Sequence, residues 1–300
     1  MVLKPMMVSI CAYGLEILGL PEAFPCSSVV GDSRLALEWT MSPGGVATQP
    51  AVWTQEGSDR LLVGWGDYAE YDLRMDRGLV NVRLGAISET EAAIAFVLSV
   101  VPLAVPLLGL EPLHCSSVLL PNGKALLVLG DSEAGKSTTA AQLRRLGCVF
   151  LADDVGAVDE QGNVWPGPPL LASRAGPEGG PIVADYDDKS VVYVGQGSLS
   201  PAPVGAAVVL RSALGSALRV HPVASANRFA ALMRYVRAPW LLRSLRAGLQ
   251  LSVVARLAGL PVFEVRFDKA THDPADVASA ILAAAVNADS GRTREDLPRV

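Results

Sequence analysis

Apolar residues occur in short runs over the first part of the chain. Several of these runs have strand-like patterns and are separated by Gly, Pro, Ser or Asp residues, at positions 6–18, 34–40, 51–55, 60–66 and 71–75. Runs of this length between turn-forming residues are typical of β-strands. We therefore expect a β-rich N-terminal lobe over residues 1–87. Its role is left open between a structural unit and a part that recognises substrate.

A longer apolar stretch follows, from Ala92 to Leu110. Ser88 is a suitable N-cap for a helix, and Glu91 three residues later completes the pattern of a capping box. Pro102 and Pro106 interrupt the stretch, acidic residues flank it, and no excess of Lys or Arg marks one side. This pattern favours a buried helix over a membrane span.

Two apolar runs flank the dipeptide Asn122–Gly123, which is a strong signal for a β-hairpin. The second run should therefore be the second strand of an antiparallel hairpin. If the turn has two residues, Pro121 faces Lys124, and the same register places His114 opposite Asp131. A histidine there would be either a phosphate-contacting residue or a structural residue at a strand end.

The second arm of this hairpin leads into a glycine-bounded loop and then a helix-forming segment. The residues fit the pattern G-x-x-x-x-G-K-[ST], in which backbone N–H groups surround a phosphate chain, the lysine contacts the β/γ-phosphates and the hydroxyl ligates Mg²⁺. A buried strand at 126–129 and a helix at 136–145 give the context that the pattern requires. The predicted nucleotide-binding residues are Gly130, Asp131, Ser132, Glu133, Ala134, Gly135, Lys136, Ser137 and Thr138. Glu133 places a carboxylate in a loop that should bind anions.

A second short apolar run, at 148–151, precedes the acidic pair Asp153–Asp154. Ligands collect at the carboxyl ends of strands in open α/β sheets, so this pair should lie near the glycine loop. Adjacent residues of a strand point to opposite faces. At most one of the two acids should then face the phosphates as a Mg²⁺ partner, unless the backbone bends.

The C-terminal half contains fewer informative patterns. We expect a buried strand ending at Arg211, a helix over 227–246 interrupted at Pro239, and a strand over 261–268. Asp273 and Pro274 are typical of a helix start, and that helix should reach Val286. The second domain would then cover residues 88–286, followed by a polar tail at 287–300. Arg211 either neutralises transferred charge or simply flanks its strand.

Composition narrows the class of protein. The chain has 300 residues, of which 50% are hydrophobic, and a net charge of −5. No basic face indicates a nucleic-acid partner. The four cysteines have no C-x-x-C spacing and fit buried thiols in a reducing compartment. Glu16 interrupts the first apolar segment, so we expect no signal peptide and a cytoplasmic location.

The hairpin "LHCSSVLLPNGKALLVLGDS", the loop "GDSEAGKST" and "FLADDVGAV" shortly after them together resemble the HPr serine kinase/phosphorylase family. The resemblance covers 110–158 well, and strand and helix order extends it toward 286. It implies an α/β fold with the P-loop nucleotide-binding core that this family shares with phosphoenolpyruvate carboxykinases. Relatives of this kind often form rings, so the resemblance also fits a homo-oligomer.

The resemblance implies specific roles for the site residues. ATP would lie on 130–138 with Mg²⁺ held by Ser137 and Asp154. Asp153 would be the general base for the serine hydroxyl of a protein or peptide, with His114 beside the transferred phosphate and Lys136 on the phosphates. The sequence does not show which of the two aspartates faces the phosphates, so the roles of Asp153 and Asp154 could be exchanged.

The family's Glu-x-Arg-Gly stretch is not found at its expected place. This departure points to diverged kinases with other acceptors, such as those that phosphorylate a precursor peptide in lasso peptide biosynthesis. The leading expectation is an ATP-dependent kinase that phosphorylates a serine of a protein or peptide, and the alternatives are a regulatory or scaffold protein that binds ATP without transferring phosphate and a kinase of a small molecule such as free serine.

Overall fold

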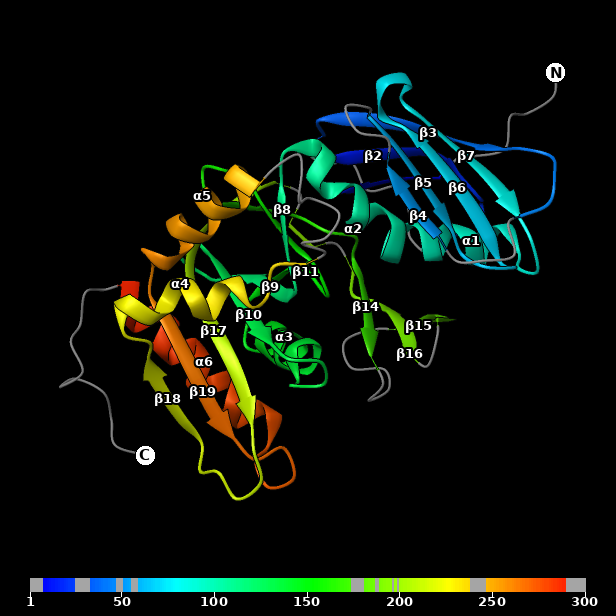
Figure 1. The fold of residues 1–300 in the computed structure, drawn as a ribbon. Coiled ribbons are helices and arrows are strands. Elements are labelled where there is room, and N and C mark those ends of the chain that lie inside the picture. Colours follow the sequence, from blue (N-terminus) through cyan, green and yellow to red (C-terminus); the bar gives the residue numbers. More distant parts are fainter. Residues whose placement is uncertain are drawn as a thin grey trace.

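The protein has two lobes built on two separate sheets (Figure 1). The computed structural model describes residues 8–24, 33–46, 51–54, 59–173, 181–186, 189–195, 197–198, 200–237 and 247–289. Strands and helices are mixed along the chain, and an N-terminal β-lobe precedes an α/β lobe. The fold is therefore of the mixed α/β class.

The N-terminal lobe is a seven-stranded sheet within the described residues, with the order β1-β2-β3-β7-β6-β5-β4. Alternating buried and half-buried positions, as in Ala69–Arg74, show that one face of the strands packs on a core. The expected strands in this part of the chain are thus confirmed. Their bounds are β1 Val8–Ala12, β2 Leu15–Leu20, β3 Leu35–Met41, β4 Ala51–Thr54, β5 Arg60–Gly64, β6 Ala69–Arg74 and β7 Leu79–Leu84.

The apolar stretch after this sheet forms a continuous helical segment. It starts as α1 (Glu89–Ala95), and Ser88 and Glu91 form the predicted capping box. It continues through a π-helical turn (Phe96–Val100), α2 (Val101–Ala104) and a 3₁₀ turn (Val105–Leu108). Among the described helices, Glu89–Leu108 alone is long and apolar enough to span a membrane, and 67% of its apolar window is buried inside the protein.

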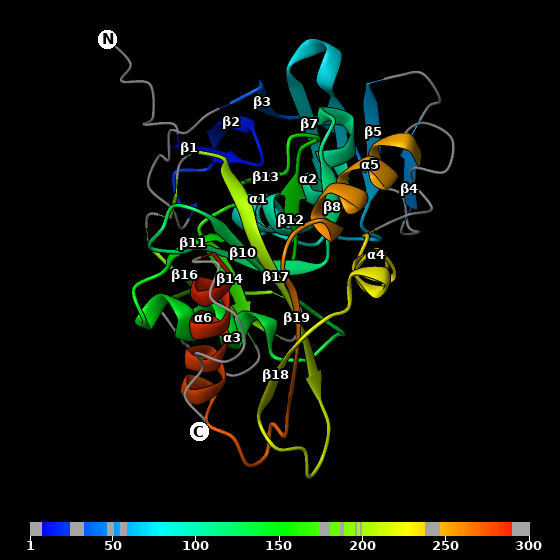
Figure 2. The same ribbon diagram turned by 90° about the vertical axis from the view of Figure 1, so that its left-hand side faces the viewer.

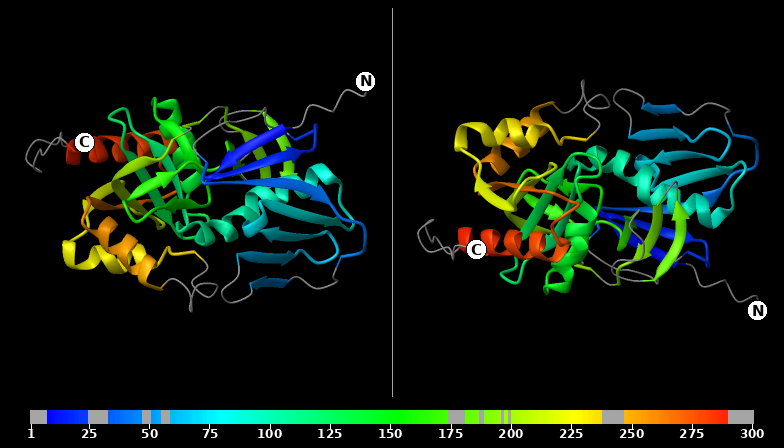
Figure 3. Two further views of the ribbon diagram at one scale, coloured as in Figure 1. Left: turned by 90° about the horizontal axis from the view of Figure 1, so that it is seen from above. Right: turned by 90° about the horizontal axis from the view of Figure 1, so that it is seen from below.

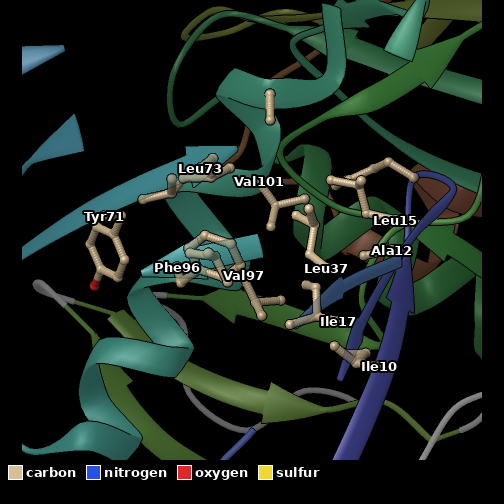
Figure 4. Packing of buried hydrophobic residues seen from close by; sticks show 14 of the residues in the cluster. Ile10, Ala12, Leu15, Ile17, Leu37, Tyr71, Leu73, Phe96, Val97 and Val101 are labelled. Carbon is tan, nitrogen blue, oxygen red and sulfur yellow. The ribbon is translucent and has the colours of Figure 1, made fainter. Parts of the chain in front are cut away.

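Aromatic side chains join this helical segment to the N-terminal sheet. The Phe96 ring lies 5.4 Å from the Trp39 ring and 5.5 Å from the Tyr71 ring, measured between centroids. Figure 4 shows Phe96 and Val97 directed at the same core as Tyr71. Edge and tilted contacts of this kind add to the stabilisation from burial. The helical segment therefore closes the core of the first lobe.

The second lobe is built on a nine-stranded sheet in the described part of the chain. Its main path runs β11-β9-β10-β17-β13-β12-β8, and β19 and β18 extend it from β17. β10 is parallel to β17, which is parallel to β19, while β9 is antiparallel to β10. The bounds are β8 Glu111–Leu113, β9 Cys115–Leu119, β10 Ala125–Gly130, β11 Val149–Ala152, β12 Gly156–Val158, β13 Asn163–Trp165, β17 Ala202–Ser212, β18 Arg219–Pro222 and β19 Val262–Phe267.

Helices cover both faces of this sheet (Figure 2). Leu126 and Val128 of β10 share a hydrophobic cluster with α3 (Lys136–Arg145) and α6 (Pro274–Asp289). Leu127 and Leu129 share the opposite cluster with α4 (Ser225–Met233) and α5 (Ala247–Ala258). Because both faces of β10 are buried, it is apolar at every position, as its sequence predicts. The strand before the glycine loop is therefore held from both sides.

A small antiparallel sheet lies beside the N-terminal lobe (Figure 3). Its order is β14-β16-β15, and its bounds are β14 Leu170–Ser173, β15 Ile182–Tyr186 and β16 Lys189–Tyr193. Leu170 and Val191 belong to the same hydrophobic cluster as the first sheet. That cluster thus contains residues from both sides of the expected boundary between 87 and 88, and the boundary itself stays a prediction. Residues 290–300, most of the expected tail, lie outside the described residues.

The predicted hairpin is present, but its register differs by one residue. Leu119 pairs with Ala125 and Cys115 pairs with Leu129. The turn has three residues, because the Leu120 N–H donates to the Lys124 carbonyl at 2.8 Å and Gly123 has a φ of 79°. Extending this ladder places His114 beside Gly130 rather than opposite Asp131, so the predicted pairing was wrong.

The expected helix over 227–246 is also different. Helix α4 begins at Ser225 and ends at Met233, and Val236 then forms an isolated bridge with Leu113. Pairing with β8 therefore ends the helix earlier than Pro239 would. Residues 238–246 lie outside the described residues. The strand ending near Arg211, the strand over 261–268 and the helix from Pro274 are confirmed.

Candidate active site at the end of β10

The glycine-bounded loop connects the end of β10 to the start of α3. Gly130 is the last strand residue, and a Cβ there would lie 2.8 Å from the Ala134 Cβ. Gly135 is the N-cap of α3, with a φ of 98° in a region that L side chains rarely adopt. The expected strand–loop–helix arrangement is thus present. The first N–H groups of α3 have no partner within the helix and carry its partial positive charge.

Lys136 is folded back onto this loop. Its side chain is buried, and its Nζ lies 3.0 Å from the carbonyls of Gly130 and Asp131 and 3.0 Å from His114 Nε2. Burial lowers the pKa of Lys136, while the nearby carboxylates of Asp153 and Asp154 oppose this shift. The ammonium group is therefore held at the centre of the loop, among acceptors that a phosphate chain can replace.

The acidic pair follows β11 directly. β11 ends at Ala152, and Asp154 has a φ of 64°, which is uncommon for a residue other than glycine. This bend removes the alternation of a regular strand. The carboxylate of Asp153 then contacts Ser137, while that of Asp154 contacts His114. Both acids therefore face the glycine loop, which the sequence allowed only if the backbone bends.

Two serine hydroxyls hold Asp153. Ser137 donates to Asp153 Oδ1 at 3.0 Å, and Ser116 donates to the same oxygen at 2.5 Å. Burial raises the pKa of Asp153, and the neighbouring charge of Asp154 adds to this, although the two serine bonds act in the opposite direction. Asp153 is thus the acid that lies beside the hydroxyl at the start of α3.

Asp154 is held by the side chains of His114 and Arg237. His114 Nδ1 lies 3.3 Å from Asp154 Oδ1, and Arg237 Nη1 donates to Asp154 Oδ2 at 2.5 Å. Burial alone would raise the pKa of Asp154, but the hydrogen bond from His114 and the charge of Arg237 outweigh it and hold the pKa well below its usual range. Asp154 is therefore a carboxylate at neutral pH.

His114 connects Lys136 and Asp154. Because the Lys136 ammonium can only donate, His114 Nε2 must accept, and the ring proton then lies on Nδ1, facing Asp154 Oδ1 and the Asp154 carbonyl at 3.2 Å. This assignment follows from the hydrogen-bond network. Although the predicted register was wrong, His114 does lie at the loop.

The remaining loop residues differ in environment. Asp131 pairs with two arginines, with its Oδ2 at 2.9 Å from Arg234 Nη2 and 3.5 Å from Arg211 Nη1. Glu133 is exposed and has a φ of 63°, and its carbonyl accepts from Lys269 Nζ at 2.6 Å. Ser132 is exposed, Ala134 is buried, and Thr138 is half-buried in the first turn of α3.

The expected pairing of Ser137 with Asp154 around Mg²⁺ stays a prediction. Ser137 was expected to act with Asp154, but its hydroxyl contacts Asp153. Oxygen donors from a hydroxyl and a carboxylate suit Mg²⁺, which takes one or two protein ligands and completes its shell with water and phosphate oxygens. In the described residues there is no cluster of three or more His, Cys, Asp or Glu side chains. Ser137 and Asp153 therefore offer two adjacent oxygen ligands of a kind that fits Mg²⁺.

Several residues at this site were not expected from the sequence. Ser116, Arg234, Arg237 and Lys269 all contact predicted site residues. One signal for Ser116 was present in the sequence, because it is two residues from His114 and two-residue spacing places side chains on the same side of an extended chain. The arginines lie at the end of α4 and just after it, and the bridge between Val236 and Leu113 holds this segment beside β8.

No known protein-family model matches this chain, and no curated protein matches it. Among solved structures, the chain has a distant similarity to the HPr(Ser) kinase/phosphatase from Coxiella burnetii. The sequence identity is 12% and the TM-score is 0.31, and the match covers 60% of this chain and 97% of that chain.

Proposed function

We propose that this protein is an ATP-dependent kinase that transfers the γ-phosphate to a serine hydroxyl of a protein or peptide. The observation that carries the proposal is the convergence of Lys136, His114 and the two acids at the glycine loop. Lys136 Nζ lies 3.0 Å from His114 Nε2, and Ser137 Oγ lies 3.0 Å from Asp153 Oδ1. A phosphoryl-transfer site needs positioning and charge neutralisation rather than covalent chemistry, and these residue types supply both.

In this proposal the loop binds the phosphate chain of ATP. The N–H groups of the loop and of the first turn of α3 donate to phosphate oxygens, and Lys136 leaves the Gly130 and Asp131 carbonyls for the β/γ-phosphates. Bound Mg²⁺ would neutralise charge that develops on the phosphates. Ser137 and Asp153 would hold it, which exchanges the two acids relative to the assignment implied by the family resemblance.

Asp154 then acts on the acceptor. Its carboxylate accepts the proton of the serine hydroxyl as the new oxygen–phosphorus bond forms and the bond to the ADP oxygen breaks. A base with a low pKa is adequate here, because proton transfer occurs late when the transition state is loose. His114 keeps Asp154 in place and lies beside Lys136, so it orients the acid toward the end of the phosphate chain.

Two considerations support a serine of a protein or peptide as the acceptor: the chemistry of the base and the family that the sequence resembles. A carboxylate base suits an alcohol, and the diverged kinases of the resembling family use serines of proteins or precursor peptides. A cytoplasmic location and self-association into a homo-oligomer belong to the same proposal. A small-molecule kinase of free serine would use the same residues, and the acceptor assay below separates the two.

A second candidate function is supported by Glu133. Its carboxylate stands in a loop proposed to bind anions, and its φ of 63° is a conformation that favours glycine. The carboxylate would oppose the negative charge that builds up on the phosphates during transfer, without preventing the backbone N–H groups of the loop from binding ATP. A protein that holds ATP for regulation, without phosphate transfer, is therefore the alternative.

The test uses the full-length protein with γ-³²P-labelled ATP and Mg²⁺. Acceptors are a degenerate peptide library with a fixed serine, the same library with alanine at that position, and free serine. We expect label on the serine library and none on the alanine library. We also expect slow hydrolysis of ATP, in which water accepts the γ-phosphate, and both EDTA and Lys136→Ala should abolish this hydrolysis. MgADP binding without any hydrolysis or transfer would contradict the kinase and support the regulatory alternative.

A further inference from the structure

Ser116 has no role in the site expected from the sequence, yet it makes the shortest contact to Asp153. Its side chain is fully buried, and its hydroxyl donates to Asp153 Oδ1 at 2.5 Å. Ser137 donates to the same oxygen. Oδ2 is therefore the oxygen that neither serine holds.

The two serines stand on parts of the fold with different freedom. Ser116 lies in β9, which pairs with β10 on one side and β11 on the other. Ser137 lies in the first turn of α3, directly after the loop that would bind nucleotide. Only Ser116 can hold Asp153 in the same position whether or not Ser137 has turned toward a bound cation.

A close contact keeps β9 and the acidic segment together. Gly156, two residues after Asp154, lies so near Cys115 that a Cβ there would be 2.5 Å from its Sγ. Cys115 separates His114 from Ser116, and these two residues reach Asp154 and Asp153 respectively. The start of β9 and the residue before it therefore contact both acids.

We propose that Ser116 is a positioning residue that fixes Asp153 so that its second carboxylate oxygen is presented to the divalent cation of the bound nucleotide. The proposal rests on the proposed function for the presence of nucleotide and Mg²⁺. Hydrogen bonds to a metal-ligating carboxylate orient the ligand, and their loss typically weakens metal binding by about 10- to 100-fold.

Ser117 provides a matched control. It is the next residue of β9, it is fully buried as well, and its hydroxyl has no hydrogen-bond partner among the described residues. Ser117→Ala and Ser116→Ala therefore remove the same atom from neighbouring buried positions. Only the second change touches Asp153.

The primary experiment measures ADP binding by calorimetry, with saturating Mg²⁺ and again in EDTA. We expect Ser116→Ala to reduce the gain in ADP affinity that Mg²⁺ provides by about tenfold, and to leave the affinity in EDTA unchanged. Ser117→Ala should match the wild type under both conditions. Ser116→Thr keeps a hydroxyl and should restore the Mg²⁺-dependent gain.

The kinetic readout separates positioning from a general loss of fold. In ATP turnover, Ser116→Ala should need about tenfold more Mg²⁺ for half-maximal rate and should raise the KM for MgATP by a similar factor, while Ser117→Ala should change neither. Equal losses of ADP affinity with and without Mg²⁺, or no loss at all, would overturn the proposal. If Ser116→Ala does not fold, Ser116→Cys keeps the side-chain size with a weaker donor and gives the same readout.

The outcome is also separable from that of the kinase proposal. A wild-type protein that binds MgADP but neither hydrolyses ATP nor transfers phosphate would contradict the kinase. The Mg²⁺ dependence of ADP binding would still decide whether Ser116 positions Asp153.

Discussion

Arg237 donates hydrogen bonds to both the carboxylate and the backbone carbonyl of Asp154. Its Nη1 donates to Asp154 Oδ2 at 2.5 Å and to the Asp154 carbonyl at 3.2 Å. The Arg237 N–H also donates to the Pro112 carbonyl, at 2.8 Å, which ties the segment after α4 to β8. Arg237, which is distant from Asp154 in the sequence, thus fixes the bend at which Asp154 has its positive φ.

Removing this arginine should affect transfer more than stability. The pair is half-exposed, with side-chain exposures of 34% for Arg237 and 40% for Asp154, so solvent screening limits its contribution to about 1 kcal/mol or less. Misplacement of a base is more costly, and we expect Arg237→Ala to lower the transfer rate by about tenfold or more. The measurements are turnover of labelled ATP with an acceptor and the urea midpoint.

The control for this change is Arg77→Ala. Arg77 forms an exposed ion pair with Asp76 in the N-terminal lobe, at 3.7 Å, far along the chain from the site. It should change neither turnover nor stability. If Arg237→Ala transfers phosphate at the wild-type rate, the arginine does not position Asp154.

Substitution of the two aspartates separates their roles. We expect Asp153→Asn to weaken ADP binding in Mg²⁺ but not in EDTA, because it replaces the carboxylate beside Ser137. Asp154→Asn should bind MgADP normally and lose transfer by about 10²-fold or more, since the acceptor proton has no base. Asparagine also tolerates a positive φ, so the bend at this position should survive.

Calorimetry in Mg²⁺ and EDTA, together with single-turnover transfer, distinguishes the outcomes. The reverse pattern, with transfer lost and binding spared in Asp153→Asn, would restore the assignment that the family resemblance implies. Equal effects of both variants on binding would mean that the two acids act as one unit.

Local signals in the sequence predicted much of the site's frame. The apolar run before Gly130, the helix start at Lys136 and the capping box at Ser88 each depend on neighbouring residues, and all three are confirmed. The hairpin at Asn122–Gly123 was also predictable, but its register was not. Two- and three-residue turns both accept Asn–Gly, and the choice is made by the ladder of β9 against β10.

The facing of the two aspartates depends on one backbone angle. A regular strand would separate them, and only the φ of 64° at Asp154 brings both to the loop. Nothing in the residue types around it requires that angle, because Arg237 and the Cys115–Gly156 contact, which fix the segment, come from distant parts of the chain. Such contacts are a property of the fold rather than of local pattern.

Replacing Glu133 should strengthen nucleotide binding. Its carboxylate stands at a loop proposed to bind phosphates, so Glu133→Gln should raise ATP affinity by up to about tenfold at low salt, with a smaller gain at high salt. Glu133→Gly removes the charge and also suits the φ of 63°, so it should match the gain in affinity and stabilise the fold by about 1 kcal/mol.

The comparison between these two variants separates charge from backbone. Calorimetric ATP titrations at two salt concentrations report the charge, and urea unfolding reports the backbone strain. Equal ATP affinities for the wild type and both variants would show that the Glu133 carboxylate does not reach the phosphates. That result would also remove the main argument for the regulatory alternative.

Glu111 gives a prediction about pH that is independent of nucleotide. It is buried in β8, its Oε1 has no hydrogen-bond partner among the described residues, and burial raises its pKa to about 8. The folded protein therefore keeps a proton on Glu111 between pH 4.5, the ordinary pKa of a glutamate side chain, and about pH 8, whereas the unfolded chain releases it. Because the folded state binds more protons in this window, the free energy of unfolding falls as pH rises through it, by at most about 1.4 kcal/mol per pH unit.

Glu111→Gln cannot ionise and should lose this dependence. The variant should be nearly as stable as the wild type at pH 5 and increasingly more stable than it toward pH 8, as measured by urea unfolding at several pH values. Glu38→Gln, at an exposed position of β3, is the matched control and should follow the wild type throughout. A stability difference between wild type and Glu111→Gln that stays constant from pH 5 to 8 would show that Glu111 is already ionised in the folded protein.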